Sequence, residues 1–451
     1  MSKPLDKLKN LRRRRRQAHS AEPKRPPRQI SRRWFWIWMA ISFVSAAGGY
    51  FWATSARIIK GPVAVAYSPL SPAFPDALGP LLGAEFSRGN TVEMLVNGAQ
   101  FFPAMLKAIA GAQHTITLET YIWAPGRISD EFIAALSERA RHGVKVLVIM
   151  DGMGTLKFRH EDRVRLQEAG VQLFLYGREH WYEIKPNISH RTHRKLLVVD
   201  GRVGFTGGMC IDDRWMGDAN SAKVWRDTEV RVEGPVVREM QSVFAANWLK
   251  TTSSVILGPD FFPQEPAGGT SLAQCIKSGP GEGLENVRMS YLTAIAAARK
   301  SIDIANAYFV PDDLAVDMLA AAARRGVRVR VMVPAINDSR IGRAVSRSRW
   351  GTLLAAGVEI YQYLPAMFHC KTMVVDDAYV TVGSANFDNR SFRINDEDCL
   401  NVIDPAVAGA ALRIFADDLK QSRRMTLEEF RGRSVFVKVA DHFFGLFRSQ
   451  F

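Results

Sequence analysis

The sequence predicts an α/β protein with two similar domains, each a mixed β-sheet flanked by helices, preceded by one apolar helix. Residues 115–152 and 301–335 read as two copies of a strand–helix–strand unit. Each copy is followed, at an equivalent place, by a His-x-Lys-x4-Asp motif. Alternating strands and helices indicate a layered α/β fold. Two long copies favour a duplicated domain over a solenoid, which needs three or more shorter units.

Positive charge is concentrated at the start of the chain. Residues 1–33 hold thirteen Lys and Arg against Asp6 and Glu22, and so supply most of the net charge of +15. The rest of the chain is only mildly basic, which does not favour a nucleic-acid-binding body. We therefore expect an anionic membrane as a partner, and no nucleic acid. The four cysteines have no close paired spacing, which predicts free thiols.

An uncharged apolar stretch follows the basic tail. Trp34 to Ala53 supplies about the 20 residues needed to cross a bilayer, and aromatic residues lie near both of its ends. We predict a transmembrane anchor at 34–54. The alternative is a cleaved signal peptide, whose apolar core is usually shorter.

The positive-inside rule places the N-terminus in the cytoplasm. A single pass through the bacterial inner membrane then puts the catalytic domain on the periplasmic face. Gly48-Gly49 leaves a re-entrant hairpin open, which would return the chain to the cytoplasm.

The body divides by its repeat. We expect a linker at 55–85, a first domain at 86–260, a second at 261–425 and a C-terminal segment at 426–451. Residues 434–451 are rich in aromatic side chains and carry a basic residue toward each end. This end fits a helix in the membrane interface or a terminal helix packed on the second domain.

The two motifs carry the candidate chemistry. The first contains His193, Lys195 and Asp200, and the second contains His369, Lys371 and Asp376. A single match is weak, but two matches at equivalent places in a repeat are strong. The apolar alternation after each His predicts a strand, on which residues two apart share a face. Each histidine should therefore lie beside its lysine.

A paired imidazole and ammonium, supplied twice, fits phosphoryl transfer. One histidine can attack phosphorus and form a covalent intermediate. The other can act as general acid and base. The lysines can hold the phosphoryl oxygens, so the chemistry requires no metal or cofactor.

The motif aspartates are expected to have a structural role. Asp200 and Asp376 lie an odd number of positions from their histidines, so they should face the other way at the strand ends. Asp227 and Glu397 are better candidates to orient the imidazoles through a hydrogen bond to the second ring nitrogen.

Over residues 86–425 the sequence resembles the phospholipase D superfamily, and within it the bacterial cardiolipin synthases. The stretches that carry the resemblance are HRTHRKLLVVDG, WRDTEVRVEGP, AYFVPDDL, HCKTMVVDD and GSANFDNRSFRINDE. The resemblance implies two domains about a pseudo-twofold axis, with both motifs in one cleft. It also implies His193 as nucleophile and His369 as general acid and base, and it carries Ser384 and Asn386 over as phosphate-site positions.

The implied reaction is phosphatidyl transfer between two phospholipids, which yields cardiolipin and glycerol. Phosphatidylglycerol is the expected donor, with phosphatidylethanolamine as a second candidate substrate. Hydrolysis to phosphatidic acid stays open, because the sequence does not show whether an alcohol outcompetes water. A nuclease is disfavoured, because the basic charge precedes the apolar stretch. Cys210 stands where Asn is expected and Glu229 where His is common, which leaves the acceptor lipid open, and the oligomeric state is not predicted.

Overall fold

The computed structural model describes residues 32–55, 61–177, 190–264 and 268–450. It forms two compact units, Met1–Ala56 and Arg57–Phe451. The first unit holds helix α2 (Arg32–Ser55), whose apolar side chains from Trp34 to Val44 are largely exposed. Among the described residues, no helix meets both the length and the apolarity expected of a membrane span. Nearly all of the basic tail lies outside the described residues.

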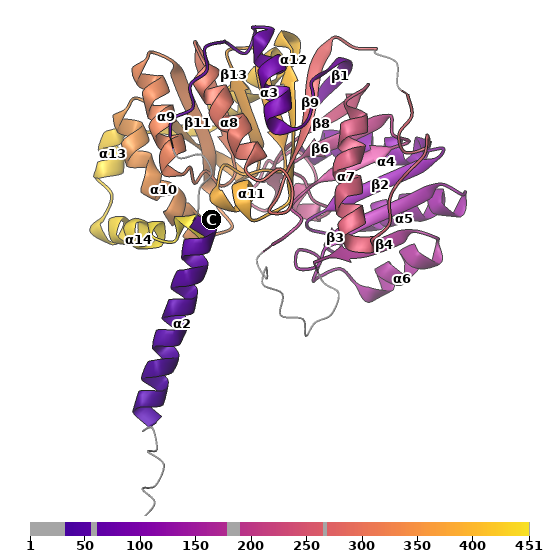
Figure 1. The fold of residues 1–451 in the computed structure, drawn as a ribbon, viewed down its shortest axis with the longest axis horizontal. Coiled ribbons are helices and arrows are strands. Elements are labelled where there is room, and N and C mark those ends of the chain that lie inside the picture. Colours follow the sequence, from indigo (N-terminus) through magenta and orange to yellow (C-terminus); the bar gives the residue numbers. More distant parts are fainter. Residues whose placement is uncertain (1–31, 56–60, 178–189, 265–267, 451) are drawn as a thin grey trace, which may run out of the picture. The chain divides into compact units, whose positions relative to one another are not determined.

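The second unit is built on one mixed sheet with helices packed against it in both halves (Figure 1). The strands of the first half are β1 (Ser87–Val96), β2 (Thr115–Thr120), β3 (Lys145–Asp151), β4 (Gln172–Tyr176), β5 (Leu196–Val199), β6 (Val203–Gly207), β7 (Trp225–Arg226) and β8 (Thr228–Glu233). Those of the second half are β9 (Ser271–Ser278), β10 (Ser301–Asn306), β11 (Arg328–Ile336), β12 (Glu359–Phe368), β13 (Lys371–Val375), β14 (Tyr379–Gly383), β15 (Glu397–Ile403) and β16 (Ser422–Met425).

The strand order confirms the duplication. The second half runs β9-β15-β14-β13-β10-β11-β12, and the first half repeats it as β1-β8-β6-β5-β2-β3-β4. The halves meet where β1 pairs antiparallel with β9, with Ser87 opposite Ala273 and Asn90 opposite Ser271. Equivalent strands therefore follow one another in the same order on both sides of the β1–β9 pair.

Helices follow many of the strands, and those after β2 and β10 are the ones that the repeat predicts. The first half contains α4 (Asn97–Gly111), α5 (Arg127–Arg141), α6 (His160–Glu168), η1 (Asp213–Trp215) and α7 (Val237–Thr252). The second half contains α8 (Asn286–Ala297), α9 (Asp313–Arg324), α10 (Arg340–Ala355), α11 (Asn389–Arg393), α12 (Pro405–Lys420), α13 (Leu427–Arg431), α14 (Val435–Gly445) and η2 (Arg448–Gln450). In α5, for example, Ile128, Phe132 and Leu136 recur at helical spacing and are buried in the core of the first half.

The two halves share a central core. Residues of α7, including Met240 and Phe244, are buried in the same apolar cluster as Val380 of β14 and Ala408 of α12. Each half also has a core of its own on the outer side of its sheet. Because the shared cluster draws on both copies, each copy fixes the position of the other.

The segment expected as a linker contains structure of its own. Helix α3 (Ala73–Leu82) lies within it, and Phe74, Leu78 and Leu82 join the core of the second half. Its apolar residues at a spacing of four form one face, which explains why this segment packs as a helix. The segment that precedes the first half therefore packs on the second half.

Candidate active site

The two motif histidines lie just before strands β5 and β13, not within them as their spacing predicts. The backbone at each histidine pairs instead with the other half. The N–H of His193 donates to the carbonyl of Asp396 at 2.8 Å, and that of His369 to Arg226 at 2.7 Å. Strand β7 pairs with β12 immediately before His369, and a bridge joins Thr192 to Asp396. This pairing places each imidazole beside the residue that follows its backbone partner.

Each histidine is bonded to a carboxylate from the other copy of the repeat. His193 Nδ1 lies 2.9 Å from Glu397 Oε2, and His369 Nδ1 lies 2.8 Å from Asp227 Oδ2. An ionised carboxylate only accepts, so in both pairs Nδ1 carries the proton and donates. The Nε2 lone pair is then available for attack on phosphorus or for proton transfer.

Both carboxylates are fixed by further donors. Ser384 Oγ donates to Glu397 Oε2 at 2.5 Å, and Trp215 Nε1 donates to Asp227 Oδ2 at 2.8 Å. The position equivalent to Ser384 is Gly208, where an added Cβ would lie 2.3 Å from Asp227 Oδ1. The glycine makes room for one carboxylate, whereas the serine binds the other. Trp215 has no motif signal that would reveal its role from the sequence.

The two motif lysines lie beside their histidines. Lys195 Nζ donates to the backbone oxygen of His193 at 2.5 Å, and Lys371 Nζ donates to that of His369 at 2.7 Å. Lys371 Nζ also lies 3.2 Å from Nε2 of His369. The exposed fractions of Lys195 and Lys371 are only 2% and 1%. Two buried ammonium groups near two imidazoles make an electropositive site suited to a phosphate.

Burial sets the charge states of the site. It lowers the pKa of His193 to about 4, although Glu397 opposes the shift. Burial and the ammonium of Lys371 lower the pKa of His369 to about 3. Both imidazoles are therefore neutral at pH 7 in the free site. Burial also lowers the pKa of Lys371 to about 8.

The partner carboxylates remain charged. Burial alone would raise the pKa of Asp227 and of Glu397. The attached histidine and a nearby lysine outweigh it, and both pKa values lie below the ordinary range. The site thus holds two neutral imidazoles, each of which donates to a charged carboxylate and lies beside a lysine.

The motif aspartates lie at the turns that end β5 and β13. Asp200 accepts backbone N–H groups from Gln113, His114 and Thr115 at 2.7–2.8 Å. Asp376 accepts from residues 299–301 at 2.6–3.0 Å. Both have positive φ, at 53° and 54°. Each carboxylate joins its strand end to the segment that starts the adjacent strand, and among the described residues neither one bonds to His193 or His369.

Asn386 and Cys210 occupy equivalent places after β14 and β6. Asn386 is 7% exposed, and its side-chain oxygen has no hydrogen-bond partner among the described residues. Cys210 is buried at 1% and is close enough to both lysines to feel their charge. One copy therefore offers a buried amide with unused hydrogen-bonding capacity, while the other offers an apolar thiol.

Aromatic rings flank the imidazoles. The ring of Tyr121 lies 5.0 Å from that of His193, and Trp225 lies 4.9 Å from His369. Lys195 Nζ lies 5.3 Å from the Tyr121 ring. These rings restrict water around the reacting groups. Tyr121 follows strand β2 and Trp225 opens the stretch WRDTEVRVEGP, and the sequence alone predicted neither one as a site residue.

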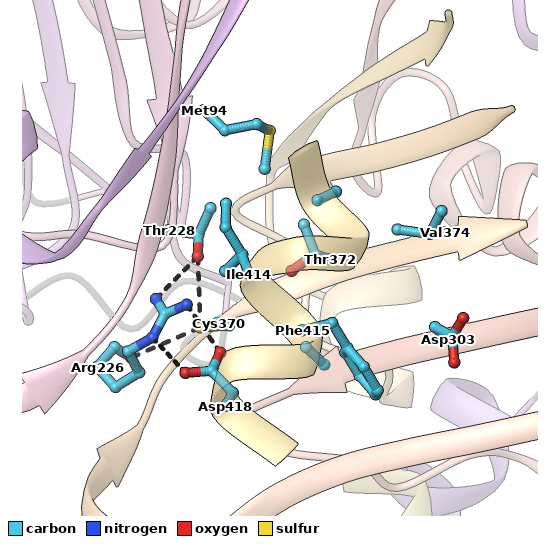
Figure 2. A pocket seen from close by; sticks show the side chains of 12 residues that line it. Met94, Arg226, Thr228, Asp303, Cys370, Thr372, Val374, Ile414, Phe415 and Asp418 are labelled. Atoms are coloured by element: carbon cyan, nitrogen blue, oxygen red, sulfur yellow. Dashed lines mark hydrogen bonds and ion pairs between the residues drawn. The ribbon is translucent and has the colours of Figure 1, made fainter. Parts of the chain in front are cut away.

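A buried ion pair supports the site behind His369. The guanidinium of Arg226 binds both oxygens of Asp418 in α12, at 2.8 and 3.0 Å, and also contacts Thr228 (Figure 2). The cavity beside it has a volume of about 20 Å³, room for roughly one water. This cavity is too small for a substrate. The ion pair instead ties β7, and with it Asp227, to the second half.

The described residues contain no group of three or more His, Cys, Asp or Glu side chains placed to hold a metal ion. The four cysteines are free and buried.

Comparison with known proteins gives one family. The family model described as "Cardiolipin synthase, PLD-like domain" matches residues 105–248 and 291–419. Cardiolipin synthase 1 of Bacillus anthracis is 32% identical over 364 residues, which cover 79% of this chain and 72% of that protein. The major cardiolipin synthase ClsA of Bacillus subtilis is 32% identical over 360 residues, covering 79% and 75%.

A solved structure shares the fold. The crystal structure of phosphatidylserine synthase from Haemophilus influenzae Rd KW20 matches with a TM-score of 0.60, covering 83% of this chain and 98% of that one. The sequence identity is 14%, so this likeness shows the fold alone.

The lowered pKa of Lys371 predicts a fall in activity at alkaline pH. Below about pH 8 the ammonium is charged and can bind phosphate, whereas above it the amine is neutral. We expect kcat/KM, which reports the free enzyme, to fall as pH rises through about 8. In Lys371→Arg the charge persists to above about pH 12, so this fall should move to higher pH even if the rate is lower. An alkaline fall at the same pH in the variant would assign it to another group.

Proposed function

This chain belongs to the cardiolipin synthase family of phospholipase D-like proteins, and we propose that it transfers a phosphatidyl group from one phospholipid to another to make cardiolipin. The observation that carries the proposal is the pair of neutral histidines, each bonded to a carboxylate of the other copy and flanked by a buried lysine. Phosphatidylglycerol is the proposed donor and acceptor, with phosphatidylethanolamine as a second candidate.

The reaction proceeds in two balanced steps. In the first, Nε2 of His193 attacks phosphorus. The bond from phosphorus to the oxygen of the headgroup glycerol breaks, and His369 gives a proton to that oxygen. In the second, the hydroxyl of the acceptor lipid returns a proton to His369 and attacks phosphorus. The phosphorus–nitrogen bond breaks, and His193 is regenerated.

Two features support this division of roles. Nε2 of His193 accepts no hydrogen bond from the described residues, whereas the ammonium of Lys371 lies 3.2 Å from Nε2 of His369. Nε2 of His193 is therefore open for attack on phosphorus, whereas the lone pair on Nε2 of His369 already faces an ammonium. A bound phosphodiester brings negative charge to His369, which favours its protonated form.

The remaining site residues bind or orient. Lys195 and Lys371 are proposed to hold the phosphoryl oxygens through their ammonium groups, and Asn386 through its amide N–H. All three side chains are buried, and among the described residues neither lysine pairs with a carboxylate. Asp227 and Glu397 fix the imidazole tautomers, and Ser384 acts through Glu397. Asp200 and Asp376 are proposed to be structural.

Helix α2 is the proposed membrane anchor. Its 24 residues extend about 36 Å at 1.5 Å per residue, against roughly 30 Å of hydrocarbon. Trp, Ser and Gly lower its average apolarity, yet Trp is favoured at membrane interfaces and Gly and Ser in packed membrane helices. By the positive-inside rule, the basic residues that precede it support an N-terminus in the cytoplasm, with the catalytic unit on the periplasmic face of a bacterial inner membrane.

The products separate a synthase from a hydrolase. With phosphatidylglycerol labelled in the headgroup and in the acyl chains, we expect labelled cardiolipin and one free glycerol per cardiolipin. The activated phosphorus of the intermediate is then captured by an alcohol before water reaches it. His193→Ala, which lacks the attacking nitrogen, is the matched inactive protein. Phosphatidic acid as the sole lipid product would establish a phospholipase instead.

A substrate with a good leaving group separates the two histidines. Phosphatidyl p-nitrophenol needs little protonation of its leaving oxygen, so His369→Ala should still release about one p-nitrophenol per enzyme in a burst. His193→Ala should release none. Turnover of phosphatidylglycerol should fall by roughly 100-fold or more in both variants. A burst in His193→Ala and none in His369→Ala would reverse the roles.

Protease accessibility tests the proposed orientation. Trypsin added to intact spheroplasts should cut the catalytic unit, because it lies outside the cytoplasmic membrane, while a cytoplasmic marker protein stays intact. Protection until the cells are lysed would place the catalytic unit in the cytoplasm and favour the re-entrant hairpin.

A further inference from the structure

Helix α14 presents an apolar face to solvent. The exposed fraction is 88% for Phe436, 62% for Val439 and 53% for Phe443. The face is completed by the exposed side chains of Val435, Leu446 and Phe447. These residues recur every three or four positions, so they form one continuous stripe. A soluble helix normally turns such a stripe into the protein.

The opposite face of α14 fixes this orientation. Asp441 is 3% exposed and pairs with Arg347 of α10 at 2.8 Å and with Arg433 at 2.5 Å. Gly445 lies so close to α10 that an added Cβ would meet the Ser348 Cβ at 2.9 Å. Breaking a buried pair of this kind leaves an uncompensated charge. The helix is therefore docked through its polar face, and its apolar stripe cannot roll inward.

The C-terminal end of α14 approaches the second motif. Asn389 of α11 donates to the carbonyl of Arg448, and Arg448 pairs with Asp313 at 3.1 Å. Helix α11 begins three residues after Asn386. Figure 1 shows α14, α10 and α11 along the same edge of the catalytic unit.

More exposed apolar residues lie near both histidines. Met153 and Leu156, 47% and 57% exposed, follow Asp151, whose carboxylate binds the N–H of Thr192 beside His193. Ile336 and Ile341, 37% and 44% exposed, flank Asp338.

Asp338 accepts from Tyr308 OH at 2.5 Å, and the Tyr308 ring lies 6.5 Å from His369. Each half thus contributes an apolar pair to the surroundings of the site.

The exposed charge on α14 itself suits an anionic partner. Asp441 is the sole acidic side chain of α14, and it is buried and paired. The exposed charged residue of α14 is Lys438, and Arg340 is exposed at the start of the neighbouring α10. An apolar stripe with basic neighbours is the pattern of a helix that lies in a membrane interface.

We propose that the apolar stripe of α14 inserts into the surface of an anionic phospholipid bilayer and holds the active site toward its lipid substrates. The inference rests on the proposed function, because only a lipid substrate makes this position useful. It adds a second membrane contact, made by the catalytic unit itself and separate from α2.

The direct test uses a single labelled cysteine in the full-length protein. All four native cysteines are buried, so Phe443→Cys offers one accessible thiol for an environment-sensitive dye. The control is Leu257→Cys, at a 75% exposed apolar position after α7. In vesicles of equal parts phosphatidylglycerol and phosphatidylcholine, the dye at 443 should shift to the blue and be quenched by nitroxide-labelled lipid. The dye at 257 should do neither.

Two results would overturn the proposal. A dye at 443 that remains water-exposed in these vesicles would show that the stripe stays out of the bilayer. A blue shift without quenching by nitroxide lipid, which grows with protein concentration, would assign the stripe to a second copy of this chain. Neither result depends on catalysis, so failure here is distinguishable from failure of the proposed function.

Kinetics give a second readout. Phe436→Ser with Phe443→Ser removes two rings that would be buried in the bilayer when the protein is bound to a membrane, so the rate on vesicle phosphatidylglycerol should fall roughly ten-fold or more. The rate on monomeric dihexanoyl phosphatidylglycerol should stay unchanged, which also shows that the variant folds. Val255→Ser with Leu257→Ser is the matched control and should leave both rates unchanged. An equal loss on both substrates, or no loss on vesicles, would contradict the proposal.

Discussion

The site depends on one interaction made twice, the hydrogen bond from each histidine to a carboxylate of the other copy. His193 binds Glu397 and His369 binds Asp227, so neither copy holds a complete imidazole–carboxylate pair alone. The β1–β9 joint, the shared core and the pairing of β7 with β12 all serve to bring these partners together. Because each imidazole and carboxylate is nearly dry, a shift of one half against the other would leave a buried polar group unpaired, at a cost of about 1–3 kcal/mol. The geometry that the chemistry needs therefore exists only when the two halves are correctly joined.

The copies meet this constraint with different residues. Ser384 donates to Glu397, whereas its counterpart Gly208 makes room for Asp227, which Trp215 binds instead. Behind His369, Arg226 pairs with Asp418 of the other half. Such differences give the two histidines distinct surroundings within a common backbone frame, as their proposed roles of nucleophile and general acid require.

Much of this arrangement could be predicted from the sequence. The strand–helix–strand repeats have clear periods, and the paired motifs place each lysine near its histidine. Asp227 and Glu397 could be singled out, but not which histidine each one binds, because the partners lie 142 and 204 residues apart. That choice follows from how the sheets join. For the same reason the histidines lie before their strands: the local pattern predicts a strand, and cross-copy backbone pairing prevails at that point. A local pattern also could not predict that α3 packs into the core of the second half, which is distant in the sequence.

Burial links the charge states of the site to the outcome of the reaction. It lowers the pKa of both histidines, which keeps Nε2 of His193, the proposed nucleophile, unprotonated. It also lowers the pKa of Lys371 while leaving the ammonium mostly charged at pH 7. The same low exposure, at most 8% for the two motif histidines and the two motif lysines, restricts the water that could attack the proposed phosphohistidine. An acceptor lipid, by contrast, brings its hydroxyl at the high local concentration that a bilayer provides. A site dry enough to activate the imidazole thus also favours capture by alcohol over capture by water, so nucleophile activation and transfer specificity have the same physical origin.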